Sequence, residues 1–148
     1  MTLLADNRIA RHRYFILERI TAGIALLGCE VKSIRAGRVQ LRDAFVRISN
    51  GEAFLLNCHI SPYPNATVVR PDPTRTRKLL LRKSEIRRLE GKVQQKGLTL
   101  IPLKLFLKRG LIKVEVGLCR GKEAPDKREV LKKRAAEREM ARALSGRE

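Results

Sequence analysis

The chain has 148 residues, and its 33 Lys and Arg against 15 Asp and Glu give a formal net charge of +18 at pH 7. This length suits one domain, whose core must be largely aliphatic because 43% of the residues are hydrophobic but only 4% are aromatic. A charge this large on a small protein indicates a polyanionic partner, above all nucleic acid. A membrane partner is not expected, because no apolar run approaches the roughly 20 residues of a membrane span and no basic amphipathic segment carries large apolar anchors.

The N-terminal segment and the cysteines indicate a cytoplasmic protein without a disulfide framework. Residues 1–7 lack the basic start, long apolar stretch and cleavage site of a secretory signal. Cys29, Cys58 and Cys119 are odd in number, widely separated and free of a Cys-x-x-Cys pair, which argues against disulfides and against the usual zinc spacings. We therefore expect buried thiols, with no bound metal and no cofactor.

Residues 7–14 form a basic N-terminal arm in which two rings, His12 and Tyr14, interleave with arginines. This composition suits phosphate binding and stacking on unpaired bases. It suits equally well an arm whose Tyr14 packs into the body of the protein. Spacing alone leaves the two interpretations even.

A strand is predicted from Tyr14 to about Leu27, with a bend or bulge at Thr21-Ala22-Gly23. Residues 28–37 then predict a short helix that ends in a left-handed glycine cap. In this helix Val31 and Ile34 share one face and should dock on the core. The polar residues should be displayed on the surface; they are Glu30, Lys32, Ser33 and Arg35.

Glu30 has two possible roles in this helix. A carboxylate can act as a general base, but no second catalytic group is visible nearby. A carboxylate flanked by Lys32 and Arg35 more often forms a structural ion pair, and we favour that role. The sequence contains no phosphate-binding glycine loop, nucleophile elbow or His-Glu-x-x-His motif, and it does not predict an enzyme.

Two hairpins are predicted farther along the chain. Asn50-Gly51 lies between two apolar strand-like runs, and this dipeptide is the strongest short-range hairpin signal. Lys108-Arg109-Gly110 lies between the strand-like runs 98–107 and 111–118. Pro102 interrupts the earlier of these runs, so that strand should bulge there or lie at a sheet edge.

A loop and a helix are predicted between the hairpins. Residues 61–76 carry four prolines, which is typical of a long loop. The loop leads into a basic cluster made of Arg75, Arg77 and Lys78. Between Arg82 and Gly97 the apolar period changes to that of a surface helix, with Gly97 as its C-cap.

These elements predict a mainly β fold. Because about 120 residues must cover every sheet edge, a small closed antiparallel barrel fits better than a sandwich, and an oligonucleotide-binding (OB) type of barrel with two or three short surface helices is the natural expectation. Residues 1–121 would form this body. They carry 24 basic and 9 acidic side chains, so most of the positive charge lies on the body.

Residues 122–148 form a separate tail with 9 basic and 6 acidic side chains. Asp126 can cap a helix there, with Glu129 closing a capping box, but the apolar stripe of that helix is thin and broken. We predict a tail that is largely disordered alone and becomes helical on a partner.

Several blocks of the sequence, in order, resemble the small protein B family, the bacterial partners of transfer-messenger RNA (tmRNA). Glu-Val-Lys-Ser-Ile-Arg-Ala-Gly occupies residues 30–37, and Arg-Lys-Leu-Leu-Leu follows at 77–81. Further matching blocks are residues 7–14, 22–24, 59–63, 72–73, 97–105 and 126–128. The resemblance spans nearly the whole chain.

The resemblance implies an OB-type barrel that binds the tRNA-like domain of tmRNA, chiefly at its D-loop elbow, and stands where an anticodon arm would be. Family members support trans-translation, the process that rescues 70S ribosomes stalled on truncated messages. The implied partners are tmRNA and the ribosome, including the decoding centre and mRNA channel of the 30S subunit. Elongation factor Tu and alanyl-tRNA synthetase would be reached indirectly, through tmRNA.

The resemblance also implies residue roles. The first RNA surface would combine Asn7, Arg11, His12 and Tyr14 with Glu30, Lys32, Ser33 and Arg35. The second RNA surface would use Arg75, Arg77, Lys78, Leu80 and Lys113. In the tail, the residues implied at the decoding centre are Asp126, Lys127, Arg128, Lys132, Lys133 and Arg134, although Asp126 is equally explained as an N-cap.

The chain departs from the family pattern at four positions. Thr21 stands where family members usually carry an acidic residue, so a contact made by the carboxylate of that residue is not expected in this chain. Arg13 and Arg82 replace an acid and a neutral polar residue, which makes the RNA face more basic. Pro125 replaces a ring, so a stacking role is not carried over to that position.

Two other functions fit parts of the sequence. A ribosomal or general RNA-chaperone protein fits the charge and the barrel equally well, and it would bind many RNAs with similar affinity. An RNA-processing enzyme is the second alternative, and the sequence shows no catalytic constellation for it.

Overall fold

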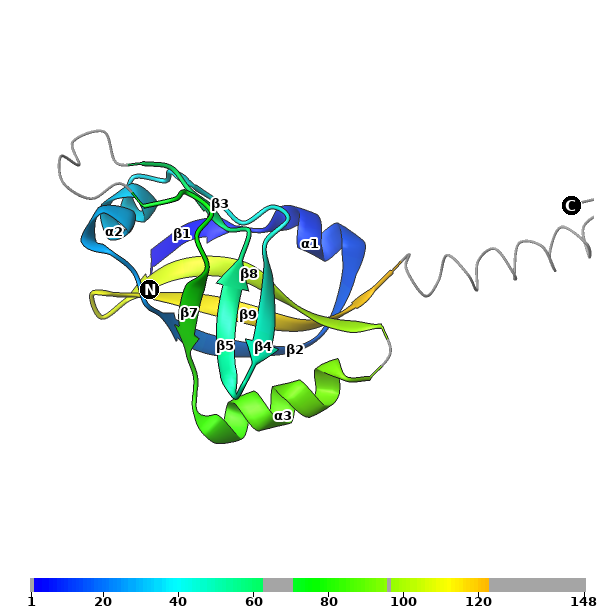
Figure 1. The fold of residues 1–148 in the computed structure, drawn as a ribbon. Coiled ribbons are helices and arrows are strands. Elements are labelled where there is room, and N and C mark those ends of the chain that lie inside the picture. Colours follow the sequence, from blue (N-terminus) through cyan, green and yellow to red (C-terminus); the bar gives the residue numbers. More distant parts are fainter. Residues whose placement is uncertain (1, 63–70, 96, 123–148) are drawn as a thin grey trace, which may run out of the picture.

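A computed structural model describes residues 2–62, 71–95 and 97–122 (Figure 1). The strands are β1 (Thr2–Asp6), β2 (Tyr14–Ile24), β3 (Val39–Gln40), β4 (Phe45–Ser49), β5 (Glu52–Leu56), β6 (His59–Ile60), β7 (Arg77–Leu80), β8 (Leu98–Lys108) and β9 (Leu111–Gly121). The helices are α1 (Arg8–Arg13), α2 (Gly28–Arg35) and α3 (Lys83–Val93). The predictions for the tail from residue 123 on, and for half of the proline-rich loop (residues 63–70), lie outside the described residues.

The main sheet closes on itself. Its strand order is β1-β8-β4-β5-β7-β2-β9, and β9 also pairs along β8, so the path through β4, β5, β7, β2 and β9 returns to β8. These pairings are antiparallel. Two strands pair with the edge of β8 that faces away from β9. Strand β4 pairs at Leu100, and β1 pairs from Lys104 to Leu107. The predicted small closed antiparallel barrel with short surface helices is confirmed (Figure 1).

Both predicted hairpins are confirmed. The β4–β5 turn has positive φ at Asn50 (52°) and Gly51 (74°), and the β8–β9 turn has positive φ at Arg109 (52°) and Gly110 (77°). Positive φ at both central residues gives the twist that a two-residue hairpin needs. The glycines adopt this conformation at no steric cost.

Pro102 lies inside the sheet rather than at its edge. Its strand, β8, has neighbours on both sides, and the β8–β9 register shifts between Pro102 and Lys104. Of the two arrangements predicted around this proline, the bulge is therefore the one that forms.

The bulge predicted in β2 is placed wrongly. The register of β2 against β9 shifts between Ile16 and Glu18, whereas Thr21 to Gly23 pair regularly with β9. Gly23 instead allows a close approach where β2 meets β7, because a Cβ at this position would lie 3.1 Å from the Leu80 Cβ. A glycine in a strand marks a crowded contact as often as a bulge.

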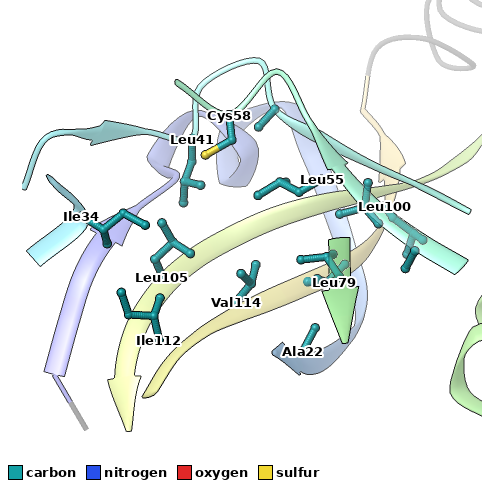
Figure 2. Close-up of a cluster of buried hydrophobic side chains, with 14 of the residues drawn as sticks. Ala22, Ile34, Leu41, Leu55, Cys58, Leu79, Leu100, Leu105, Ile112 and Val114 are labelled. Carbon is teal, nitrogen blue, oxygen red and sulfur yellow. The ribbon is translucent and has the colours of Figure 1, made fainter. Parts of the chain in front are cut away.

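An aliphatic cluster that includes Leu55, Leu105 and Val114 fills the barrel (Figure 2). Helices α2 and α3 lie at opposite ends of the barrel in Figure 1, and each adds a buried residue, Ile34 and Leu89, to this cluster. The two helices therefore close the ends of the barrel core. The apolar residue that docks α2 most deeply is Ile34, which is fully buried, while Val31 is only partly buried.

The cysteines are mostly buried, as predicted. Cys58 and Cys119 are buried, and burial raises the pKa of each thiol to about 11, so both are protonated at neutral pH. Cys29, on the first turn of α2, is only half-buried.

The sequence does not predict β1 or α1. Helix α1 is too short to form on its own, and it is held by tertiary contacts, because Ala10 packs into a second small cluster with Ile101, Leu103 and Cys119. The predicted helix α3 is confirmed, but it ends at Val93 with Gln94 as its C-cap, so the prediction of Gly97 as the cap is wrong, although Gly97 does have positive φ (85°). Among the described residues, the structure has no helix that is long and apolar enough to cross a membrane.

Candidate nucleic-acid interface

A buried carboxylate, Glu30, lies at the centre of the predicted site. Its side chain is 2% exposed and accepts hydrogen bonds from two guanidinium groups. Arg75 Nε donates to Oε2 at 2.9 Å and Nη2 to Oε1 at 2.5 Å, and Arg77 Nε donates to Oε2 at 2.8 Å. Glu30 also caps its own helix, because Oε1 accepts from the Leu27 N–H at 2.8 Å. One carboxylate therefore joins α2 to the segment that enters β7.

Arg77 completes this arrangement from inside the protein. Its side chain is 0% exposed, and its remaining N–H groups donate to backbone carbonyls, Nη1 to Cys58 at 2.7 Å and Nη2 to Pro73 at 3.0 Å. The guanidinium thus connects α2 with the chain after β5 and with the segment before β7. We call Glu30, Arg75 and Arg77 the ion-pair centre.

The ion-pair centre favours the charged form of Glu30. Burial by itself raises the pKa of this carboxyl, but hydrogen bonds from Arg75, the Leu27 N–H and Arg77 outweigh the burial and lower the pKa below its ordinary value. The hydrogen bond to Glu30 correspondingly raises the pKa of Arg75. Two guanidinium groups against one carboxylate leave one net positive charge, and the exposed part of it lies on Arg75, whose side chain is 30% exposed.

These contacts correct the predictions for α2. The structural ion pair of Glu30 is confirmed, but its partners are Arg75 and Arg77 rather than Lys32 and Arg35. The reason is helical phase: Glu30, Ser33 and Ile34 lie three and four residues apart and form the buried face. Lys32 and Arg35 are exposed, as predicted.

Burial also corrects the predicted RNA contacts of four side chains. Glu30, Ser33 and Arg77 are buried, and so is Asn7, which is 6% exposed. In this structure their side chains cannot touch RNA directly. They can act only by holding other groups in place.

Asn7 shows how such a residue holds its neighbours. Its Oδ1 accepts from the Ala10 N–H at 3.3 Å and caps α1, while its Nδ2 donates to the Pro102 carbonyl at 2.9 Å. The first contact starts the helix and the second fixes the helix to β8. Asn7 is therefore an anchor of α1.

Helix α1 presents basic groups to solvent. Arg11 and His12 are exposed, and Arg11 pairs with Asp6, Nη2 to Oδ1 at 2.9 Å. Tyr14 is partly buried and packs against the small cluster around Ala10. The interpretation in which Tyr14 packs into the body is confirmed, whereas RNA contact by the exposed His12 stays a prediction.

The second predicted surface is divided in two. Arg75 and Arg77 belong to the ion-pair centre, whereas Lys78, Leu80 and Lys113 line an open pocket of about 540 Å³ between β7, β2 and the start of α3. Leu80 is 55% exposed at this pocket. Lys78 pairs with Glu52 at 2.6 Å, Nζ to Oε2.

Thr21 and Arg82 also line the pocket. With Lys78, Lys83 and Lys113 beside them, the lining has more cations than carboxylates, which are Glu52 and Glu85, and it carries an exposed apolar side chain, Leu80. This combination suits a phosphate next to a sugar or base. In β7, buried Arg77 and Leu79 alternate with exposed Lys78 and Leu80, a pattern that the sequence Arg-Lys-Leu-Leu does not reveal by polarity.

The described part of the chain has no group of three or more His, Cys, Asp or Glu side chains that could hold a metal ion. The tail residues implied at the decoding centre lie outside the described residues. Among the described residues, the candidate interface therefore consists of the exposed face of α1, the exposed residues of α2 with the ion-pair centre beneath them, and the pocket beside β7.

Comparison with known proteins gives consistent matches. The model of the SmpB protein family matches residues 4–146. The SsrA-binding protein of Acaryochloris marina is 61% identical over 96% of this chain and 93% of its own length, and that of Symbiobacterium thermophilum is 58% identical over 97% and 92%. A solved chain described as "tmRNA-SmpB: a journey to the center of the bacterial ribosome" is 55% identical, with a TM-score of 0.69 over 81% of this chain and 85% of that one.

Replacing Glu30 by Gln should destabilise the fold, because the amide leaves two guanidinium groups without a counter-charge and one of them is fully buried. We expect the free energy of unfolding in urea to fall by about 3 kcal/mol. The matched control is Glu52→Gln, which breaks the exposed pair with Lys78 and should cost about 0–1 kcal/mol. Equal effects of the two substitutions would contradict the structural role of Glu30.

The loss of stability caused by Glu30→Gln should depend on pH. Since the folded pKa of Glu30 lies below its ordinary value of 4.5, its stabilisation is fully present above that pH and is lost as the pH falls through the folded pKa. The difference in unfolding free energy between wild type and Glu30→Gln should therefore shrink as the pH is lowered below 4.5 and through the folded pKa of Glu30. A difference in unfolding free energy that grows on acidification would contradict a lowered pKa of Glu30 in the folded state.

Proposed function

We propose, from the premise that this chain belongs to the SmpB family, that it binds tmRNA and takes part in trans-translation on the ribosome. The family match covers residues 4–146, and curated SsrA-binding proteins are near 60% identical over almost the whole chain. The ribosome-associated structure with the same fold supports both partners. Such a role is one of binding rather than catalysis, and it belongs to the cytoplasm, where ribosomes work.

The observation that carries the proposal is the ion-pair centre beneath a basic surface. Glu30, Arg75 and Arg77 fix α2 against β7, so Lys32 and Arg35 of the helix project from a rigid base. The pocket beside β7 adds Lys78, Leu80 and Lys113 in a fixed relation to them. Charges held at constant spacing select a folded RNA, whereas mobile charges attract any polyanion.

We infer that the tRNA-like domain of tmRNA is the part that is bound. A folded elbow offers phosphates at set distances and unpaired loop bases, and the interface offers rigid cations with exposed apolar and ring groups, including Leu80 and His12. The barrel would then stand in place of the anticodon arm that the tRNA-like domain lacks. Elongation factor Tu and alanyl-tRNA synthetase would meet this chain only through the bound RNA.

The RNA that copurifies with the chain tests this proposal. We expect sequencing of that RNA to show tmRNA as the enriched species, and the purified protein to prefer the tRNA-like domain over a duplex of equal length. If about 6 phosphates are neutralised, affinity for either RNA should fall roughly 1,000-fold between 50 and 200 mM salt, so both RNAs must be compared at one salt concentration. Similar affinity for all RNAs, with no tmRNA in the copurified pool, would favour a general RNA chaperone.

We further propose that the body binds RNA and that residues 122–148 act on the ribosome. The body carries +15 of the +18 net charge, so most of the attraction for RNA lies there. The tail residues Asp126, Lys127 and Arg128 with Lys132, Lys133 and Arg134 would contact the decoding centre.

Truncation before Asp126 tests this division of labour. The shortened chain should bind the tRNA-like domain within about twofold of the full chain, because each retained phosphate contact keeps its share of the affinity. It should fail to support tagging of peptides on ribosomes stalled at the end of a truncated message, measured in a reconstituted translation system. Loss of RNA binding by the truncated chain would contradict the division.

A further inference from the structure

Phe15 is an aromatic side chain without a structural role in either hydrophobic cluster. It lies one residue into β2, is 46% exposed and is a member of neither cluster of packed residues. Its ring therefore contributes little to the core. Single exposed apolar side chains are common on protein surfaces, so the groups around the ring decide whether it can bind a partner.

Two cations lie over this ring. Arg120, directly opposite Phe15 on β9, places Cζ 5.8 Å from the ring centroid, and Lys122 places Nζ 5.1 Å from it. Both lie within the distance at which a cation is attracted to an aromatic face. We call Phe15, Arg120 and Lys122 the ring platform.

The ring platform has a fixed position next to α1. The backbone N–H of Lys122 donates to the Arg13 carbonyl at 2.8 Å, and Lys122 Nζ donates to the Arg11 carbonyl at 3.3 Å. These bonds tie the end of β9 to the C-terminal turn of α1. The ring platform consequently lies beside the C-terminal turn of α1, which carries further basic residues.

The exposed basic side chains of α1 add to this surface. They are Arg8, Arg11, His12 and Arg13. Among the described residues, the carboxylate paired with this group is Asp6, bound to Arg11. A polyanion with an exposed flat group fits this combination of charge and ring.

We propose that the ring platform stacks on an unpaired base of an RNA strand, with Arg120, Lys122 and α1 contacting the phosphates on either side of that base. This inference rests on the proposed function, since it adds a further contact to an RNA-binding chain. None of the three residues belongs to the two RNA surfaces predicted from the sequence. The platform distinguishes unpaired from paired RNA, because a duplex keeps the faces of its internal bases stacked on each other.

A short RNA probe with a reporter base tests the proposal. The probe is a 12-nucleotide single strand that carries one 2-aminopurine, whose fluorescence is quenched by stacking, and the comparison is a duplex of the same sequence. With the full chain, Phe15→Ala should weaken binding of the single strand about tenfold and remove the quenching, and leave duplex binding within about twofold. Phe15→Trp, which keeps an aromatic face, should retain affinity and quenching.

Controls separate stacking from general damage. Leu3→Ala removes an apolar side chain of similar exposure, 56%, from β1 at a distance from the ring platform, and it should change neither RNA affinity. Phe15→Leu keeps apolar volume without a π-face and should behave like Phe15→Ala. The thermal midpoint of each variant should stay close to that of the wild type, because the ring lies outside both clusters.

The outcomes are distinct. Single-strand binding and quenching that survive Phe15→Ala overturn the ring platform, and so does an equal loss of single-strand and duplex binding. If the wild-type chain shows no preference for the tRNA-like domain, the proposed function fails whatever Phe15 does. If the wild type shows that preference but Phe15→Ala binds and quenches the single strand as the wild type does, the ring platform is wrong and the proposed function stands.

Discussion

One buried carboxylate, that of Glu30, determines how the two basic parts of this protein lie relative to each other. It accepts hydrogen bonds from Arg75, Arg77 and the first turn of its own helix, and Arg77 extends the connection to the backbone at Cys58 and Pro73. Removing one partner of such a centre leaves an uncompensated buried charge, whereas replacing a whole buried ion pair by apolar residues is often neutral for stability. The centre is therefore better explained by the position that it gives to α2 and β7 than by the stability that it adds.

The surface that we assign to RNA follows from this constraint. Because Arg77 and Leu79 point inward, their neighbours in β7, Lys78 and Leu80, must point outward into the pocket beside β2 and α3. Because Glu30, Ser33 and Ile34 form the buried face of α2, Lys32 and Arg35 must face solvent. Helix α1 is held separately, by Asn7 and Ala10, and it brings its cations to the same protein body. Buried polar residues thus arrange the exposed ones.

Much of the fold can be predicted from sequence because its signals are local. Asn50-Gly51 specifies its turn through positive φ, and residues 111–118 alternate as a half-buried strand must. The barrel itself follows from short antiparallel strands whose edges have to be covered. The partners, tmRNA and the ribosome, were predicted only from the resemblance to the family, because no local sequence signal identifies them.

The parts that sequence reasoning missed depend on contacts between distant residues. A charged residue such as Arg77 is expected at the surface unless its partner is known, and Glu30 lies 47 positions away. Helix α1 has too few residues for a periodic signal, and its stability comes from Ala10 docking against β8 and β9. The bulge in β2 lies between Ile16 and Glu18, where no glycine or proline marks it.

The affinity of the double variant Glu30→Leu with Arg77→Met for the tRNA-like domain tests the central claim most directly. This pair of substitutions keeps the net charge at +18 and replaces the buried ions by apolar side chains, so the chain should still fold. Our account predicts that the affinity falls about tenfold or more. The reason is that α2 and β7 are no longer fixed relative to each other, so phosphate and base contacts that depend on their spacing are lost. Wild-type affinity in the folded double variant would contradict the claim that the ion-pair centre positions the RNA-binding surface.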